Sequence, residues 1–160
     1  MSNKKLLSKE EIQKLITING ELISMDKFTW CSECSVLKIE EIIENLKIDF
    51  SEMDKITINI VSEAEIEVRD ECTIDCFSNC KIKCGFHCNI SAWSSCKIIA
   101  DSYCTIDVLN NNIITMISYN NVNCGGENTI RGKYNNIIRG GKISTNKITY
   151  SGYGNIETME

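Results

Sequence analysis

Cysteine is the residue type with the most chemical potential in this chain, because many of its ten thiols are regularly spaced. A cysteine recurs every eight residues through the middle of the sequence, at Cys72, Cys80, Cys88, Cys96 and Cys104. A free thiol can fill a core as a small hydrophobe, bind a soft metal ion or form a disulfide. The first residues, MSNKKLLSKEEIQKL, lack the apolar stretch of a signal peptide. We therefore expect a cytoplasmic protein with reduced, buried thiols.

Cys31 and Cys34 form a Cys-x-x-Cys pair, which is a weak candidate for zinc or redox chemistry. Structural zinc needs four ligands, and the sequence has no second Cys-x-x-Cys and no pair of histidines. A redox pair normally stands between a strand and a helix, whereas here only a short run with a helical pattern follows.

A thiol cluster in the repeats is a second, minor metal candidate. In a coil of two octads, Cys72 and Cys76 would face Cys84 and Cys80, and such a set could hold a soft metal ion. The same spacing arises whenever small residues fill a narrow core. We expect core packing, with no metal and no other cofactor.

Catalytic chemistry has little support in the sequence. His87 is the only histidine, and it precedes Cys88, so a Cys–His nucleophile pair is conceivable. The repeat pattern directs Cys88 inward, however, where it could not reach a substrate. The sequence shows no phosphate-binding loop, paired-carboxylate site or Ser–His–Asp pattern. We expect a protein that is not an enzyme.

Three ladders of residues with a period of eight indicate the elements that carry these side chains. The central ladder is Ile58, Ile66, Ile74, Ile82, Ile90, Ile98, Ile106, Ile114, Val122, Ile130 and Ile138. Two residues earlier runs the corner ladder, which consists of the five cysteines above and then Asn112, Asn120, Asn128 and Asn136. Two residues later runs a small-residue ladder from Ile60 to Gly140. Residues spaced by two share one face of a strand, so each octad predicts a short strand followed by a corner.

The corners indicate how many octads complete a coil. Large apolar residues follow every second strand, so the corners repeat with a period of sixteen. We therefore predict an all-β fold, a two-sided parallel β-solenoid with about 16 residues per coil. The asparagines of the corner ladder should then form amide ladders, which satisfy their own polar groups in the core.

The two edges of this solenoid are the candidate interaction surfaces. One edge, the apolar edge, carries Val61, Phe77, Trp93 and Leu109. We expect it to receive the N-terminal segment or a second subunit, because such a strip is rarely left in water. The other edge, the aromatic edge, carries Phe86, His87, Tyr103, Tyr119 and Tyr134. Tyrosines on a rigid polar edge are typical of recognition surfaces, although they also stack for packing alone.

The chain divides into a non-repetitive segment, 1–50, and a solenoid, 51–160, whose last coil is irregular after residue 140. A capping-box match at Ser8 predicts a first helix, and Asn19-Gly20 predicts a hairpin. The run VLKIEEIIENLK after Ser35 predicts a second helix. We expect this segment to be a small α/β cap over the exposed strand edges of the first coil, or a docking module.

Charge and hydropathy exclude some partners. The net charge of −5 argues against nucleic-acid binding and against attraction to anionic membranes. No segment is apolar over the roughly 18 residues that a membrane span requires. Acidic residues gather in the early coils and basic residues in the late coils, which could orient subunits against each other.

The octads from 56 to 140 resemble the double-octad β-solenoid repeats of bacterial ice-nucleation proteins, and also short repeat proteins often encoded by phages and prophages. The ice-nucleation octad is similar to Ala-Gly-Tyr-Gly-Ser-Thr-x-Thr, whereas this chain has Cys/Asn-x-Ile-x-small. The resemblance implies the fold. It implies ice binding only with a regular Thr-x-Thr array, which charged residues interrupt here.

These observations lead to one preferred function and several alternatives. We expect a non-catalytic binding protein that forms a homo-oligomer and binds a host protein or a small nucleotide-like ligand. The phage-like repeats suggest a counter-defence accessory of a mobile element, which would act in the host cytoplasm. The main alternative is a structural subunit of a virion or filament. A thiol metal site and ice binding are minor alternatives.

Overall fold

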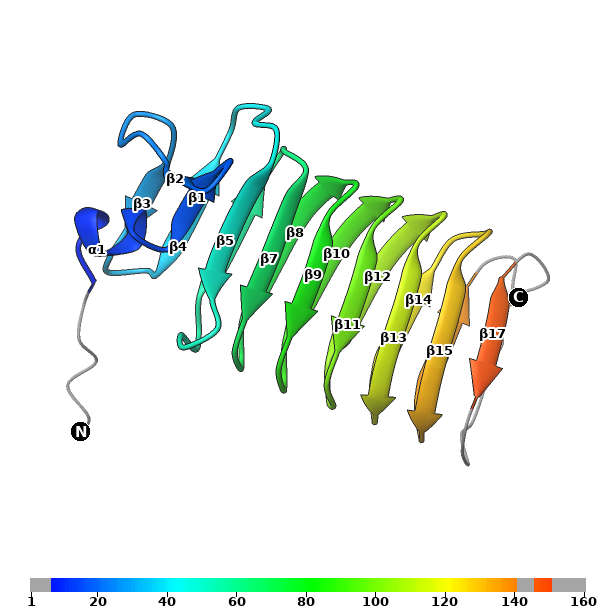
Figure 1. Cartoon of the computed structure of the whole chain (residues 1–160). Coiled ribbons are helices and arrows are strands. Elements are labelled where there is room, and N and C mark those ends of the chain that lie inside the picture. The colour runs from blue at the N-terminus through cyan, green and yellow to red at the C-terminus, as the bar shows by residue number, and fades with distance from the viewer. Residues whose placement is uncertain (1–6, 141–145, 151–160) are drawn as a thin grey trace, which may run out of the picture.

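The computed structural model describes residues 7–140 and 146–150, and it confirms the expected two-sided parallel β-solenoid. One sheet contains, in spatial order, β17 (Lys147–Tyr150), β15 (Thr129–Tyr134), β13 (Ile113–Ser118), β11 (Lys97–Ala100), β9 (Lys81–Cys84), β7 (Ala64–Val68), β5 (Leu46–Phe50), β1 (Ile16–Ile18) and β2 (Glu21–Leu22). The other contains β16 (Ile137–Gly140), β14 (Asn121–Cys124), β12 (Thr105–Asn110), β10 (Asn89–Ser94), β8 (Thr73–Ser78), β6 (Thr57–Ile60), β4 (Val36–Ile39) and β3 (Thr29–Cys31). Figure 1 shows the strands of the two sheets stacked along one axis.

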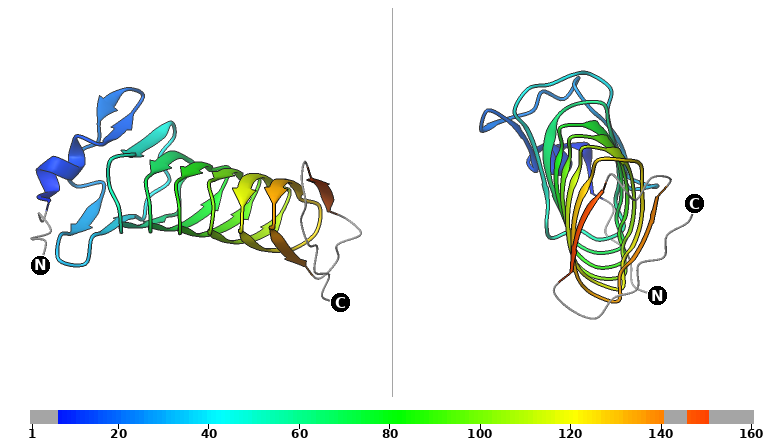
Figure 2. Two further views of the ribbon diagram at one scale, coloured as in Figure 1. Left: turned by 90° about the horizontal axis from the view of Figure 1, so that it is seen from below. Right: turned by 90° about the vertical axis from the view of Figure 1, so that its right-hand side faces the viewer.

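Each coil is built from two octads, one in each sheet. Ile90 pairs with Ile74 on one side and with Ile106 on the other, so neighbouring strands of a sheet are sixteen residues apart. Successive coils lie almost directly over one another when seen along the axis (Figure 2). The three ladders are therefore buried columns, and they form a thin core of isoleucine with small residues at both ends of each strand.

The corners share one backbone conformation, which the octad pattern did not reveal. The residue before each corner-ladder residue adopts a positive φ: Glu71, Asn79, His87, Ser95, Tyr103, Asn111, Tyr119, Glu127 and Asn135. A left-handed residue reverses the chain in little space, and Asn or Gly tolerates it best. The aromatic edge instead holds His87, Tyr103 and Tyr119 at this position, with φ of 56°, 62° and 57°.

The N-terminal segment confirms two local predictions. Helix α1 (Lys9–Gln13) begins at Ser8 with a complete capping box, in which Ser8 and Glu11 exchange hydrogen bonds. The Asn19-Gly20 turn joins β1 and β2 as an antiparallel hairpin. β1 then pairs antiparallel with β5, and β3 with β4, so short antiparallel strands end both sheets.

The predicted helix after Ser35 is wrong. β4 and β5 occupy this run, and they pair in parallel with β6 and β7. Alternating burial in β5 fits a strand, and Ile42, which the helical pattern placed on the buried face, is 82% exposed. Pairing with an existing parallel sheet satisfies the backbone better than an isolated helix would, so the tertiary context overrides the helical pattern. The parallel stack thus begins at β4, upstream of residue 51.

The last described strand departs from the sixteen-residue register. β17 pairs with β15 through Ile148 and Ile130, which are eighteen residues apart instead of sixteen. Asn146 likewise takes the next position above Asn128, where its Oδ1 accepts hydrogen bonds from the Asn128 backbone and side chain. The expected further match at Ile156 lies outside the described residues. Within those residues, no helix has the length and apolarity needed to cross a membrane.

Candidate functional site

Three of the five predicted residues on the aromatic edge form one continuous ring stack. His87 stacks on Tyr103 and Tyr103 on Tyr119, with 5.1 Å between ring centroids in each pair. The two tyrosine planes differ by 5°. Tyr103 and Tyr119 are 51% and 50% exposed, so the stack presents its ring edges to solvent. The ring spacing follows the distance between neighbouring strands, because consecutive coils supply the rings.

Phe86 and Tyr134 lie on the same edge but in a different column. They precede the left-handed position by one residue and are three coils apart. The two coils between them place Ser102 and Ser118 in that column, and both serines are buried. Phe86 and Tyr134 are 43% and 48% exposed, so they flank the stack at its two ends without extending it.

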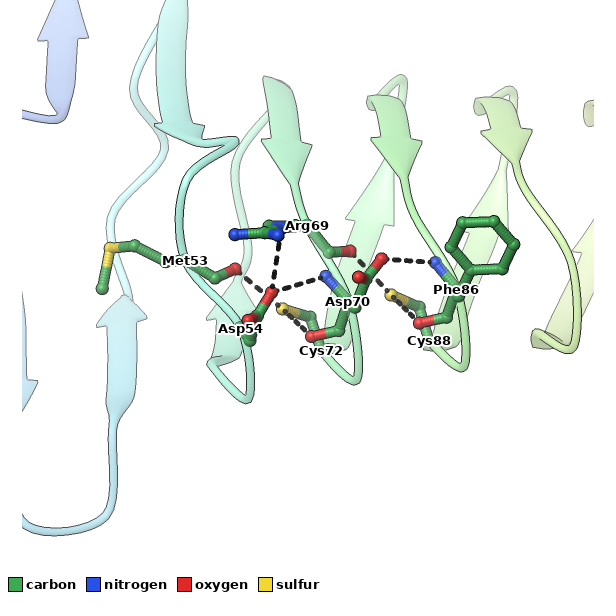
Figure 3. A network of polar contacts seen from close by, with 7 residues as sticks. All are labelled: Met53, Asp54, Arg69, Asp70, Cys72, Phe86 and Cys88. Atoms are coloured by element: carbon green, nitrogen blue, oxygen red, sulfur yellow. Dashed lines mark hydrogen bonds and ion pairs between the residues drawn. The ribbon is translucent and has the colours of Figure 1, made fainter. Parts of the chain in front are cut away.

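Side chains that connect coil to coil hold the corners of this edge in place. The Asp70 carboxylate accepts from the Phe86 backbone N–H at 2.8 Å, and the Asp54 carboxylate accepts from the Asp70 N–H at 3.2 Å (Figure 3). Arg69 completes the network by pairing with Asp54 at 3.5 Å. Gly85 leaves room for the Asp70 carboxylate, which would collide with a Cβ at that position. These contacts fix the early corners of this edge, including the one that carries Phe86.

The apolar edge is exposed along its length. Val61, Phe77, Trp93 and Leu109 are 45%, 46%, 50% and 50% exposed, and the Phe77 and Trp93 rings lie 4.4 Å apart. The expectation that the N-terminal segment packs against this edge is not met in the described residues, because all four side chains remain about half exposed. A shallow groove of about 740 Å³ runs beside Trp93 and Leu109. A second groove of about 380 Å³ continues it past Val61 and Phe77.

The thiols of the corner ladder donate hydrogen bonds to the carbonyl oxygens of the corners. The Cys88 Sγ lies 3.3 Å from the Arg69 oxygen and 3.6 Å from the Phe86 oxygen (Figure 3). The Cys104 Sγ lies 3.1 Å from the Gly85 oxygen, which is the equivalent position one coil later. Because His87 stacks outward on Tyr103 while Cys88 is fully buried, the two side chains form no nucleophilic pair.

The asparagines of the corner ladder occupy the same sites and add bonds between coils, as predicted. The Asn120 Nδ2 donates to the Asp101 carbonyl at 2.9 Å and to the Asn136 Oδ1 at 3.0 Å. Its Oδ1 accepts from the Cys104 backbone N–H at 2.8 Å. Asn112 and Asn128 make the equivalent bonds at the other edge. The amide ladder therefore satisfies buried backbone groups as well as its own.

Cysteines from both inward ladders meet in the core. The Sγ atoms of Cys76, Cys80 and Cys96 all lie within 4.8 Å of one another. Cys84 likewise interacts with Cys88 and Cys104, although these three sulfurs do not all lie within that distance of one another. The sequence anticipated the contact of Cys76 with Cys80 but paired Cys84 with Cys72. A cysteine that recurs at intervals of four and then sixteen residues is the signal that would have found both sets.

Neighbouring thiols perturb one another's ionisation within these sets. Hydrogen bonds from Cys76 and Cys80 lower the pKa of Cys96, and the backbone N–H of Cys80 adds to this effect. The same contacts, together with burial, raise the pKa of Cys76. In the second set, hydrogen bonds from Cys84 and Cys88 lower the pKa of Cys104. The contact with Cys104 raises the pKa of Cys88, but hydrogen bonds from Cys72 and Cys84 outweigh this effect, so the pKa of Cys88 is lowered as well.

Cys31 and Cys34 lie outside the core and differ from the other thiols. Their sulfurs form a disulfide, with the Cα atoms 5.5 Å apart. The expectation of reduced, buried thiols is therefore met by eight cysteines, from Cys72 to Cys124, and is wrong for these two. In this state their sulfurs are not available as zinc ligands.

Comparison of the chain with protein-family models, with curated proteins and with solved structures finds no match.

Proposed function

We propose that this chain is a non-catalytic binding protein that recognises its partner with the aromatic edge. The observation that carries the proposal is the stack of His87, Tyr103 and Tyr119 on left-handed corners. A bulky side chain in this conformation costs about 1 kcal/mol or more, and Asn or Gly would avoid most of that cost. Half-exposed rings recover little of it by burial. Recognition is a function that would retain them, because rigid tyrosines contribute strongly to interfaces at a small entropic cost.

The spacing of the rings favours a protein partner over a small planar ligand. A nucleobase inserted between two rings needs about 7 Å between them, which is twice the contact distance of about 3.5 Å. The rings are 5.1 Å apart, so they leave no such gap. A row of ring edges flanked by Phe86 and Tyr134 instead offers a broad, flat surface. A host protein as target, and a counter-defence role, is the version of this proposal that the phage-like octads support.

We further propose that the apolar edge joins two copies of the chain. Four large apolar side chains in one strip, each 45–50% exposed, are unusual on a monomer. Acidic residues dominate the early coils, for example Glu63, Glu65 and Glu71, and basic residues such as Arg131 and Lys133 occur in the late coils. An antiparallel arrangement would place acidic coils of one copy against basic coils of the other, which favours a second copy as the occupant.

The binding proposal is tested with a variant that removes the rings and keeps the backbone. Tyr103→Asn with Tyr119→Asn places at the left-handed corners the residue that the opposite edge uses at Asn79 and Asn111. A partner captured from a host lysate is first identified by mass spectrometry and purified. Its Kd for the wild type and the double variant is then measured by calorimetry.

We expect at least about tenfold weaker binding, because each buried tyrosine at an interface contributes on the order of 1–2 kcal/mol. The control is Ile99→Asn with Ile113→Asn, since these residues are similarly exposed but lie on a sheet face. Equal affinity of the tyrosine variant and the wild type would refute the assignment of this edge.

The oligomer proposal is tested by native mass spectrometry of wild type, Trp93→Lys and Ile113→Lys. We expect a dimer for the wild type and for Ile113→Lys, and a monomer for Trp93→Lys, because a buried lysine would face the apolar strip of the partner. A monomeric wild type at micromolar concentration would contradict the proposal.

A further inference from the structure

The core contains two sets of three thiols that have the same spacing in the sequence, four and then sixteen residues apart. The first triad is Cys76, Cys80 and Cys96, whose sulfurs lie within 4.8 Å of one another. The second triad is Cys84, Cys88 and Cys104, in which each residue follows its counterpart by eight positions. All six thiols are at most 5% exposed. The first triad lies behind the apolar edge and the second behind the aromatic edge, but only the first brings all three sulfurs within 4.8 Å of one another.

Core packing alone does not require the third cysteine of each triad. Cys76 and Cys84 belong to the small-residue ladder, where the following coil has Ala92 and Ala100. Cys76 and Cys84 each have two corner-ladder partners, four and twenty residues later, and both partners are cysteines. At Ala92 and at Ala100, the two equivalent partners are one cysteine and one asparagine. Three positions of the small-residue ladder have two cysteines as corner-ladder partners, and two of them, Cys76 and Cys84, are cysteines, while the third is Val68.

We propose that the first triad binds one monovalent copper ion, Cu(I), through its three sulfurs. Thiolates are soft ligands that select Cu(I), zinc or iron–sulfur clusters, and structural zinc takes a fourth ligand that the triads do not supply. With metal–sulfur distances of about 2.3 Å, three sulfurs around one ion lie about 4 Å apart. The first triad reaches this spacing by moving its sulfurs inward by less than about 1 Å from the 4.8 Å limit.

Binding exchanges protons for the metal without any redox step. Each Cu–S bond replaces an S–H bond, the thiol proton passes to the buffer, and copper stays monovalent.

The first triad lies close to the surface of the apolar edge. The Cys96 sulfur contacts the Phe77 and Ser94 carbonyl oxygens at 3.8 and 3.5 Å, and both residues lie at the ends of strands that lead into corners. This sulfur therefore lies one layer of backbone beneath the surface, and a local opening of one corner exposes it.

The test is an anaerobic titration of the fully reduced protein with Cu(I) held by a chromophoric chelator. Native mass spectrometry counts the bound ions, and thiolate-to-copper absorption in the near ultraviolet reports the ligands. We expect one ion in the wild type. Cys76→Ala should remove it and Cys84→Ala should keep it, while both variants should fold, because alanine already occupies the same ladder at Ala92 and Ala100.

Cys124→Ala is the matched control, since Cys124 is a buried thiol of the same ladder whose sulfur accepts from the Asn146 side chain and not from another thiol. It should bind as many ions as the wild type. Two results would overturn the proposal: a wild type that takes no copper from the chelator, or a Cys76→Ala variant that retains the wild-type stoichiometry. Circular dichroism of each variant verifies that the solenoid is intact when the ions are counted.

Discussion

The two halves of the corner ladder occupy equivalent places and bond the same backbone groups with different atoms. In the early coils, the Cys80 and Cys88 backbone N–H groups face the sulfurs of Cys96 and Cys104. In the late coils, the Asn112 and Asn120 N–H groups donate to amide oxygens at 2.9 Å. Sulfur is a weak acceptor and a weak donor, whereas an amide is strong in both roles. The comparison indicates that the late coils depend on the ladder for stability, while the early coils keep thiols at some cost in hydrogen bonding.

The largest loss of stability should follow from removing one asparagine side chain of the corner ladder. Asn120→Ala removes three hydrogen bonds in a fully buried site and leaves the Cys104 N–H without its oxygen. We expect a loss of about 3 kcal/mol in the free energy of unfolding, at about 1 kcal/mol for each bond. Urea denaturation measures it. Cys104→Ala should lose clearly less, and equal losses for the two variants would remove the distinction between the halves.

A second substitution should affect both halves alike, because it acts on a corner feature that they share. Gly85 in the early coils and Gly125 in the late coils each lie against a side chain from the preceding coil, Asp70 and Asn110 respectively. A Cβ would also lie 2.9 Å from the Arg69 oxygen or 2.8 Å from the Leu109 oxygen. We expect Gly85→Ala and Gly125→Ala each to cost about 2 kcal/mol. The measurement is the fall in melting temperature of each variant relative to the wild type. Clearly different falls for Gly85→Ala and Gly125→Ala would show that the ladder chemistry also affects the stability of the corners.

Extending the amide ladder by one residue should stabilise the chain. In Cys104→Asn, the new Oδ1 would accept from the Cys88 N–H, and the new Nδ2 would reach the Gly85 oxygen that the thiol now contacts. The two side chains have similar volumes, so we expect a gain of about 1 kcal/mol. A loss of stability in urea would mean that the early coils are shaped for sulfur.

The smallest predicted effect is a difference in backbone hydrogen exchange within the wild-type protein. Backbone amides that face sulfur should exchange with solvent faster than those that face an amide oxygen. We compare Cys88, which faces the Cys104 sulfur, with Cys104, which faces the Asn120 oxygen. A difference of about 1 kcal/mol corresponds to roughly fivefold faster exchange at Cys88. Equal protection in an NMR exchange experiment would show that sulfur and oxygen are equivalent acceptors here.

The regular part of the fold could be predicted from the sequence because each ladder has one physical cause. Ile74 and its equivalents repeat every eight residues because every strand must bury the same central position. The large residues at Phe77 and Trp93 revealed the sixteen-residue coil for the same reason, since alternate corners lie on opposite edges. The amide ladder followed from the cost of burying an unpaired asparagine.

The remaining features depend on information that no local pattern contains. The helical pattern from Val36 to Leu46 was misleading because only the finished sheet offers those residues strand partners. Tyr103 and Tyr119 gave no sign of a left-handed backbone, since tyrosine rarely adopts it. The thiol triads join two ladders and two coils, so they became visible only once the turn of the solenoid was known.

The sixteen-residue coil also limits how this gene can change in length. Removal of residues 89–104 would bring Thr105 to the place of Asn89, its partner in the neighbouring strand, and every column would stay on its own edge. Removal of only eight residues would keep the strands in phase but move Leu109 and all later corners to the opposite edge. Insertions and deletions should therefore survive selection in whole coils, which lengthen or shorten both edges together.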